Sequence, residues 1–273
     1  MSEKRGQRLD AEIVARGLAE SRARAQAMIL GGGIAVDGDV VSRPAHRVPP
    51  ESNITLVRPP LPFVSRGGLK LAHALSRFDI ATAGKVAADI GASTGGFTDV
   101  LLQGGALRVY AIDVGYGQLA WELRNDPRVV VLERQNVRYL EELPEPIDLA
   151  VIDVSFISLL QILGPVQRLL KADGDAVCLI KPQFEAGRRQ VGKKGVVRDA
   201  QVWREVLKRV LNYAQEKDWT TLGLERSPIR GPKGNVEFLA HLSLGAAQPQ
   251  IPLAERIEEV IPADTSGDHV PNR

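Results

Sequence analysis

The spacing of apolar residues predicts two differently built segments. In the first, the pattern predicts helices over 9–18 and 21–30, the second capped by Ser21 and stopped by three glycines. Short strands are expected at 34–36, 40–41 and 54–57, with the Asp37-Gly38-Asp39 turn between the first two. Asp-Gly between β-forming residues is a strong hairpin signal. This segment therefore reads as a small α+β unit.

From residue 63 the pattern alternates between strand and helix. Strands are expected at 86–90, 109–112, 129–132, 149–154 and 176–180, and helices at 66–78, 98–103, 159–170 and 200–214. Repeated βα units predict an α/β fold, a mostly parallel sheet with helices on both faces. Two late strands, 220–225 and 236–243, follow each other directly and suggest an antiparallel edge.

Proline-rich stretches suggest the domain boundaries. The run RPPLP at 58–62 breaks helix and sheet and predicts a stiff linker, although an ordinary surface loop has the same composition. We therefore expect a small domain over 1–57 and a larger one over 63–245. The segment 246–273 contains four prolines and predicts a flexible tail with a short helix at 255–260.

Composition excludes some classes of protein but does not identify the function. The single cysteine, Cys178, allows no internal disulfide and suggests a reducing, cytoplasmic location. The N-terminal residues lack the apolar core of a signal peptide, and no apolar run approaches the roughly 20 residues of a membrane span. The net charge of +2 (35 − 33) implies no partner by itself.

The run DIGASTGGFTD, residues 89–99, is the strongest chemical signal. It joins a predicted strand to a predicted helix, where glycines let the backbone approach a ligand and the helix offers free N–H groups. Its glycine spacing is not that of a dinucleotide site, and it has no phosphate-binding lysine. We expect a nucleoside-type cofactor, with S-adenosyl-L-methionine the obvious candidate, and no metal site.

Polar residues at the carboxyl ends of the strands extend this site, because ligands of open α/β sheets bind there. Asp113 can accept hydrogen bonds from a ribose, and Asn136 can bind an adenine edge; a helix cap and a turn residue are the alternatives. Asp153 and Lys181 follow apolar strands. A buried lysine beside a carboxylate can accept a proton from a hydroxyl, although a structural ion pair would have the same sequence.

Charged residues elsewhere are individually weaker candidates. Lys70 and Glu237 would, taken singly, most often be solvated surface charges. A glycine-punctuated basic loop suits a polyanionic substrate, and a set of arginines in the small unit suits structured RNA, although acidic residues lie among them. The loop residues are Arg188, Arg189, Lys193 and Lys194, and the arginines are Arg8, Arg16, Arg22 and Arg24.

Longer motifs resemble known families. Residues 8–48 resemble the S4-like RNA-binding domain, while SRGGLKL, DIGASTGGFTDVLL, DVGYGQLAW, DVSFISL, KPQFE and GVVRD resemble the TlyA family of ribosomal RNA 2′-O-methyltransferases, members of the Rossmann-like FtsJ group. The resemblance implies a catalytic tetrad at Lys70, Asp153, Lys181 and Glu237. It also implies S-adenosyl-L-methionine as donor and a ribosomal cytidine 2′-hydroxyl as acceptor.

Taken with that resemblance, the strand-end and glycine-rich residues form a predicted donor site, and Arg66 joins the predicted RNA contacts. The predicted donor-site residues are Asp89, Gly91, Ser93, Thr94, Gly95, Gly96, Phe97, Asp113, Asn136 and Asp153. Two alternatives remain: a non-catalytic RNA-binding or ribosome-assembly factor, and a membrane-active hemolysin. The predicted cofactor site argues against the second.

Overall fold

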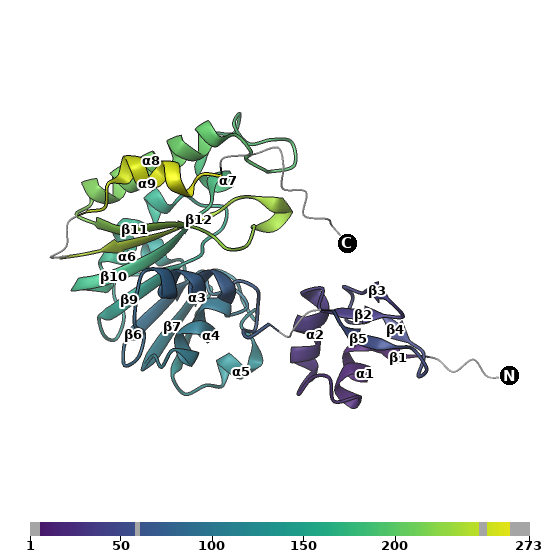
Figure 1. Ribbon diagram of the computed structural model, residues 1–273. Coiled ribbons are helices and arrows are strands. Elements are labelled where there is room, and N and C mark those ends of the chain that lie inside the picture. The colour runs from purple at the N-terminus through teal and green to yellow at the C-terminus, as the bar shows by residue number, and fades with distance from the viewer. Residues whose placement is uncertain (1–5, 58–60, 246–249, 263–273) are drawn as a thin grey trace. The chain divides into compact units, whose positions relative to one another are not determined.

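A computed structural model of the chain describes residues 6–57, 61–245 and 250–262. The backbone divides into two compact units between Arg66 and Gly67, and we describe each by itself (Figure 1). Of the expected linker, residues 58–60 lie outside the described residues, and residues 61–62 belong to the smaller unit.

The smaller unit packs two helices on a short sheet. Helices α1 (Leu9–Ala15) and α2 (Arg22–Leu30) contact each other, and strands β2 (Ile34–Val36), β3 (Asp39–Val40) and β5 (Ile54–Leu56) form a sheet in the order β3-β2-β5. The Ser21 side chain accepts a hydrogen bond from the Arg24 N–H, which confirms the predicted cap. Asp37 and Gly38 have φ of 51° and 94°, as the predicted tight hairpin turn requires.

Two strands of this unit have no sequence signal. Strands β1 (Gln7–Arg8) and β4 (Arg47–Val48) pair antiparallel and contain two residues each. Two residues are too few for a period-2 pattern to appear. The unit is held by a core of aliphatic side chains from both helices and the strands: Leu9, Ile13, Ala25, Met28, Ile29, Ile34, Val36, Val48 and Ile54.

The larger unit is built on a seven-stranded sheet in the order β11-β12-β10-β9-β6-β7-β8. The strands are β6 (Val86–Ile90), β7 (Arg108–Asp113), β8 (Val129–Glu133), β9 (Ile147–Ile152), β10 (Leu170–Ile180), β11 (Thr220–Arg226) and β12 (Phe238–Ser243). The first five run parallel, and β12 runs antiparallel to both of its neighbours. The predicted mostly parallel α/β sheet with an antiparallel strand near its edge is confirmed.

The order of the strands reverses beside β6. The chain runs outward from β6 to β7 and β8, and then returns to place β9 on the other side of β6. Ligands of such sheets bind at the carboxyl ends of the two strands where the order reverses. Here those ends are Ile90 and Ile152, which are register partners.

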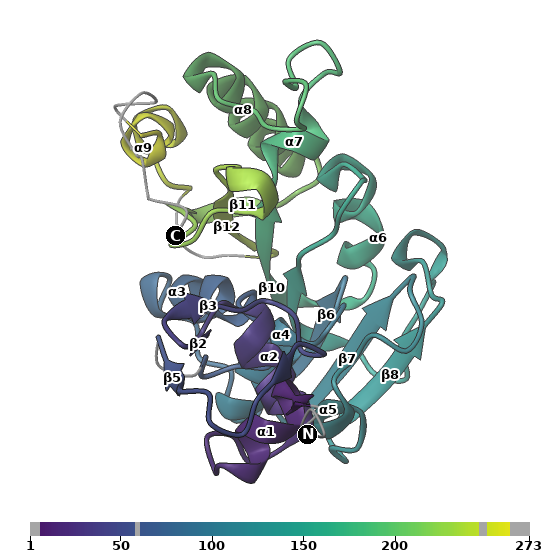
Figure 2. The same ribbon diagram turned by 90° about the vertical axis from the view of Figure 1, so that its right-hand side faces the viewer.

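Helices cover both faces of the sheet. Helices α3 (Gly68–Arg77) and α4 (Gly96–Gln103) pack together on one face, and α6 (Leu163–Gln167) lies on the other (Figure 2). Helix α8 (Ala200–Glu216) shares a hydrophobic core with α6, to which Val206, Leu211 and Leu163 contribute. The remaining short helices are α5 (Trp121–Arg124), α7 (Pro182–Glu185), η1 (Val137–Tyr139), η2 (Leu159–Gln161) and η3 (Pro232–Gly234).

The predicted helix at 159–170 is wrong as a single element. The structure has η2, the short helix α6, and then the first residue of β10 at Leu170. Pro165 lies within α6 and has no N–H to donate, so it fits only near a helix start. The apolar residues have helical spacing, but a continuous helix would place Pro165 in its interior, and Leu170 already begins β10.

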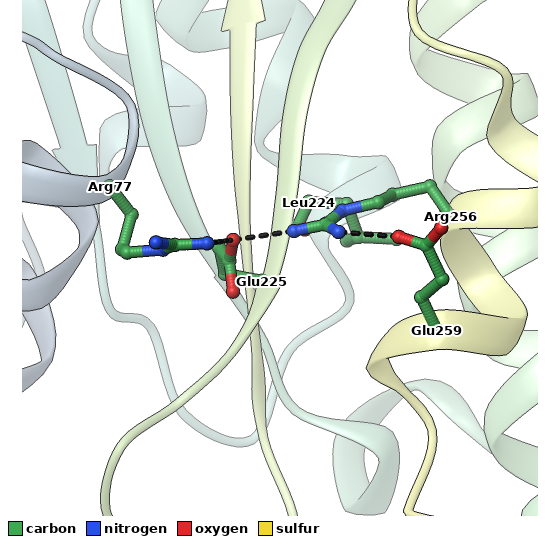
Figure 3. A network of polar contacts seen from close by, with 5 residues as sticks. All are labelled: Arg77, Leu224, Glu225, Arg256 and Glu259. Carbon is green, nitrogen blue, oxygen red and sulfur yellow. Dashed lines mark hydrogen bonds and ion pairs between the residues drawn. The ribbon is translucent and has the colours of Figure 1, made fainter.

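Residues 250–262 fall in the expected flexible tail, yet the structure gives them fixed contacts. Helix α9 (Leu253–Val260) buries Ile257 and Val260 in the main core. Arg256 of α9 and Arg77 of α3 both reach the Glu225 carboxylate of β11, at 2.5 and 3.0 Å (Figure 3). The rest of the expected tail, 246–249 and 263–273, lies outside the described residues. No helix in the described part of the chain is long and apolar enough to span a membrane.

Candidate active site

Lys181 and Asp153 form a nearly buried ion pair at the carboxyl ends of the central strands β9 and β10. Asp153 follows β9 and Lys181 follows β10, so the adjacent parallel strands deliver both side chains to one place. The Lys181 Nζ lies 2.5 Å from the Asp153 Oδ1 and donates to the Ser155 hydroxyl at 2.9 Å. The lysine side chain is 9% exposed, so little of it contacts bulk water.

A second ion pair joins Lys70 to Glu237. Lys70 comes from α3 and Glu237 immediately precedes β12, and their Nζ and Oε2 atoms lie 2.6 Å apart with the glutamate side chain fully buried. The other carboxylate oxygen accepts from the Gln183 side-chain amide at 3.1 Å. A Cβ at Gly231 would lie 2.0 Å from the Glu237 Oε1, so only glycine leaves the carboxylate in this position.

The sheet register brings the two pairs together. Ile180 is paired with Phe238 across the antiparallel strands, so the next positions outward are Lys181 and Glu237. Gln183, two residues after Lys181, completes the link through its hydrogen bond to Glu237. The structure thus assembles Lys70, Asp153, Lys181 and Glu237, the four residues of the predicted tetrad, as two neighbouring ion pairs, one buried and one nearly buried.

The glycine-rich turn lies beside the first pair. Gly91 follows β6 with φ of 88°, and a Cβ there would come within 2.8 Å of the Asp153 carbonyl oxygen. Gly95 has φ of 93°, and a Cβ there would collide with Leu123. Both positions therefore need glycine for two reasons, the backbone angle and the space. The turn places the N-terminus of α4 next to the tetrad.

Asp89 is the next-to-last residue of β6 and is buried just before this turn. Its Oδ2 accepts from the Thr98 N–H at 2.9 Å and from the Thr98 hydroxyl at 2.7 Å, which fixes the first turn of α4. Its Oδ1 is buried with no hydrogen-bond partner among the described residues. The pKa of this carboxyl is raised to about 7: burial is the main cause, the Thr98 hydrogen bonds oppose it, and the carboxylates of Asp153 and Asp113 add to it. A ligand that carries a positive charge or N–H donors would fit the unpartnered Oδ1 and would favour the ionised form of this carboxyl.

The raised pKa predicts a specific pH dependence of stability. The unfolded Asp89 carboxyl loses its proton near pH 3.8 but the folded one near 7, so ligand-free protein becomes less stable as pH rises between these values. Asp89→Asn does not titrate and keeps an oxygen that can accept from Thr98. Relative to wild type, its free energy of unfolding should rise by about 2–3 kcal/mol between pH 5 and pH 8. Urea unfolding at several pH values measures this; a constant difference would contradict it.

The other predicted donor-site residues have defined places. Both Asp113 carboxylate oxygens accept main-chain N–H groups, from Ser93 at 2.8 Å and Gly115 at 2.6 Å, and so hold the loops after β6 and β7 together. The Asn136 Oδ1 caps η1 by accepting from the Arg138 N–H, as the turn-residue alternative described. Of the glycine run, the side chains of Ser93 and Thr94 are exposed, whereas Gly95, Gly96 and Phe97 are buried.

The arginines of the smaller unit have partners within it. Arg8 and Arg22 lie 2.8 and 3.2 Å from the fully buried carboxylate of Asp10, whose pKa the Arg8 hydrogen bond holds well below its usual range. Arg16 bonds Glu12 and two carbonyls, and Arg24 donates to the carbonyls of Leu61 and Phe63. These side chains therefore stabilise the unit itself, while Arg8 and Arg22 remain 43% and 57% exposed.

The basic loop has exposed charges on an anchored backbone. Arg188, Arg189, Lys193 and Lys194 are exposed. The Asn235 side chain accepts from the Val197 N–H at 3.1 Å and donates to the Gly195 carbonyl at 3.0 Å. The end of this loop, at Gly195 and Val197, is thus tied to the segment that leads into Glu237. Arg66, also a predicted RNA contact, is exposed at the end of the smaller unit.

Four residues near the tetrad had no predicted role: Ser155, Phe156, Gln183 and Glu185. All lie inside DVSFISL and KPQFE, next to Asp153 or Lys181 in the sequence, and this proximity was the available signal. Phe156 is 90% exposed with φ of 63° and packs against Phe184, with ring centroids 4.9 Å apart.

Known proteins share this fold and these motifs. The FtsJ-like methyltransferase family model matches residues 63–244, and the S4 domain model matches residues 7–54. The putative rRNA methyltransferase YqxC of Bacillus subtilis is 48% identical over 242 residues, covering 86% of this chain and 85% of its own. The 16S/23S rRNA (cytidine-2′-O)-methyltransferase TlyA of Mycobacterium tuberculosis is 50% identical over 238 residues, with 86% and 89% covered.

Solved structures agree. A putative hemolysin from Streptococcus thermophilus superposes with a TM-score of 0.75 at 42% identity and covers 94% of each chain. The family model alone accounts for most of the larger unit, and the relatives extend across both units. The chain is therefore a methyltransferase of the FtsJ-like family that carries an S4 domain ahead of its methyltransferase domain.

Proposed function

We propose that this protein transfers a methyl group from S-adenosyl-L-methionine to the 2′-hydroxyl of a cytidine in ribosomal RNA. The observation that carries the proposal is the nearly buried Lys181–Asp153 pair, which lies beside the Lys70–Glu237 pair and next to the glycine-rich turn. The substrate class follows the relative TlyA, whose name states cytidine-2′-O methylation of 16S and 23S rRNA.

The donor fits the residues of the turn. S-adenosyl-L-methionine supplies a methyl group on a positively charged sulfur together with an ammonium group. The unpartnered Asp89 Oδ1 suits such a cation, the positive φ at Gly91 and Gly95 lets the backbone approach it, and the exposed Ser93 and Thr94 border the same turn. Asp113 and Asn136 follow the next strands and complete the proposed donor site.

The tetrad then acts on the acceptor. The 2′-oxygen attacks the methyl carbon, the methyl–sulfur bond breaks, and the hydroxyl proton passes to a solvent water. Lys181 carries three N–H donors, more than its two contacts use, and holds the oxygen during this step. Asp153 and Ser155 fix the direction of the Lys181 Nζ. Lys70 and Glu237 orient the ribose, and the Lys181 ammonium donates to the oxygen on which negative charge develops. The basic loop and the smaller unit bind the RNA backbone.

A direct assay tests the proposal. Purified protein and labelled donor should methylate ribosomal subunits, or RNA extracted from them, that lack the modification, and mapping should find 2′-O-methylcytidine. Donor binding without transfer to any ribosomal RNA would contradict the enzymatic proposal and favour a non-catalytic RNA-binding factor. Leakage of liposomes caused by the pure protein would favour the hemolysin alternative.

Phe156 supplies a second prediction for the acceptor side. An exposed ring beside the tetrad can stack on a base that has left its helix, a contact worth about 1–3 kcal/mol. Phe156→Ala should lower kcat/KM for RNA by about 5- to 150-fold in steady-state assays, with unchanged donor affinity. Leu107→Ala removes an exposed apolar side chain just before β7, at the amino-terminal end of the parallel strands and so away from the tetrad. This variant should behave like wild type. Equal activity of the two variants would contradict this role.

A further inference from the structure

A buried carboxylate near the tetrad takes no part in the chemistry described above. Glu185 is the last residue of α7, and its side chain is 1% exposed. Burial raises the pKa of its carboxyl, and hydrogen bonds from Ser158 and Leu159 act against that rise. Because a buried charge is costly unless it is well bonded, the partners of this carboxylate indicate what it is for.

Both oxygens of Glu185 bind one end of the same loop. The Oε2 accepts from the Ser158 hydroxyl at 2.6 Å, and the Oε1 accepts from the Leu159 N–H at 2.7 Å. On the other side, Arg209 of α8 donates to the Glu185 carbonyl and lies 3.8 Å from the Oε2. Glu185 therefore connects α8 and α7 to the loop of residues 153–158, which joins β9 to η2.

That loop carries three residues of the proposed site. Asp153 and Ser155 contact Lys181, which is the N-cap of α7, and Phe156 packs on Phe184 within α7. Three successive contacts thus join the loop to α7. They are made by Lys181, Phe184 and Glu185 on the side of the helix. The contact made by Glu185 is the one furthest from the reacting atoms.

The loop needs such a restraint. Phe156 has φ of 63°, a conformation that a bulky residue adopts only when its surroundings impose it. Its ring is 90% exposed, so burial of the ring does not impose the conformation. Two hydrogen bonds to a buried carboxylate, two and three residues further along, are well placed to do so.

We propose that Glu185 is a positioning residue that fixes the 153–158 loop against α7, so that Asp153 and Ser155 stay on Lys181 and Phe156 stays on Phe184. Its consequence for catalysis rests on the proposed function. Its consequence for the loop does not, which allows the two to be tested separately.

Two substitutions at this position separate the hydrogen bonds from the rest of the side chain. Glu185→Ala removes both bonds. Glu185→Gln keeps an oxygen for the Leu159 N–H and an amide that can donate to the Ser158 hydroxyl, so it should rescue much of the effect. Glu258→Ala removes an exposed carboxylate paired with Arg204 on α8 and serves as the control.

The first measurement is amide hydrogen exchange of residues 154–160 in the protein without substrates. We expect exchange at Leu159 to be about tenfold faster in Glu185→Ala, and close to wild type in Glu185→Gln and Glu258→Ala. The second is methyl transfer. We expect kcat to fall by about 10- to 100-fold in Glu185→Ala, with a much smaller change in donor affinity, because the proposed donor residues other than Asp153 lie at the ends of β6, β7 and β8.

Each outcome decides a separate point. Unchanged amide exchange in Glu185→Ala overturns the proposal, whatever its rate of methyl transfer. A parallel loss of donor binding and methyl transfer also overturns it, because that result indicates general unfolding. If Glu185→Ala does not fold, Ser158→Ala removes one of the two bonds and must still accelerate exchange in the loop. Absence of transfer by wild type would overturn the proposed function, while the exchange result would still decide the role of Glu185.

Discussion

Replacing Lys181 by alanine will reduce methyl transfer by at least about a hundredfold, and we expect closer to a thousandfold, while donor binding stays near wild type. Lys181 is the cation that contacts both Asp153 and Ser155, so its loss removes the group that stabilises the developing 2′-oxyanion. The proposed donor residues belong to other strand ends. Single-turnover transfer of a labelled methyl group to ribosomal RNA, with calorimetry of donor binding, measures the two effects separately.

A matched control lies at the other end of the same strand. Lys171 of β10 pairs with Asp148 at 2.5 Å, as Lys181 pairs with Asp153, but its side chain is 46% exposed. Lys171→Ala should transfer methyl groups like wild type. Lys181→Arg keeps the charge but replaces a compact ammonium by a planar fork, and should remain strongly impaired. Full activity of Lys181→Ala would remove Lys181 from the mechanism.

Much of the larger unit was predictable because its strands are buried on both faces. Val86–Ile90 is an uninterrupted buried strand whose bounds match the prediction, and the strand-end rule led directly to Asp153 and Lys181. The glycine run could also be interpreted from the sequence. Gly91 and Gly95 each have a positive φ and no space for a Cβ, so both positions require glycine.

Contacts between distant segments were not predictable from local patterns, and only the family resemblance grouped Lys70 with Glu237. Lys70 and Glu237 are 167 positions apart, so their pairing follows from the packing of α3 against the sheet edge and has no local pattern. The same limit applies to Glu185, whose partners lie 26 and 27 positions away. For the arginines of the smaller unit the sequence showed acids among them, but not that Asp10 is fully buried and engages Arg8 and Arg22.

The Lys70–Glu237 pair gives the second large expected effect, this time on stability. Removing one partner of a buried pair leaves the other charge uncompensated, at a cost of about 3–5 kcal/mol. Lys70→Met and Glu237→Gln should each lower the free energy of unfolding, by an amount near that range for Lys70→Met and less for the polar glutamine. The double variant should lose less than the sum, since it buries no unpaired charge.

The double variant separates the effect of this ion pair on stability from its effect on methyl transfer. It should recover stability in urea unfolding yet stay impaired in methyl transfer, because the ribose-orienting charges are absent. The exposed pair Arg108–Glu145 provides the reference cycle, for which single and double removals should each change stability by under about 1 kcal/mol. Additive losses at Lys70 and Glu237 would show that the two charges are not coupled. Recovery of activity along with stability would show instead that the pair serves the fold alone, and would leave Lys181 and Asp153 as the whole catalytic apparatus.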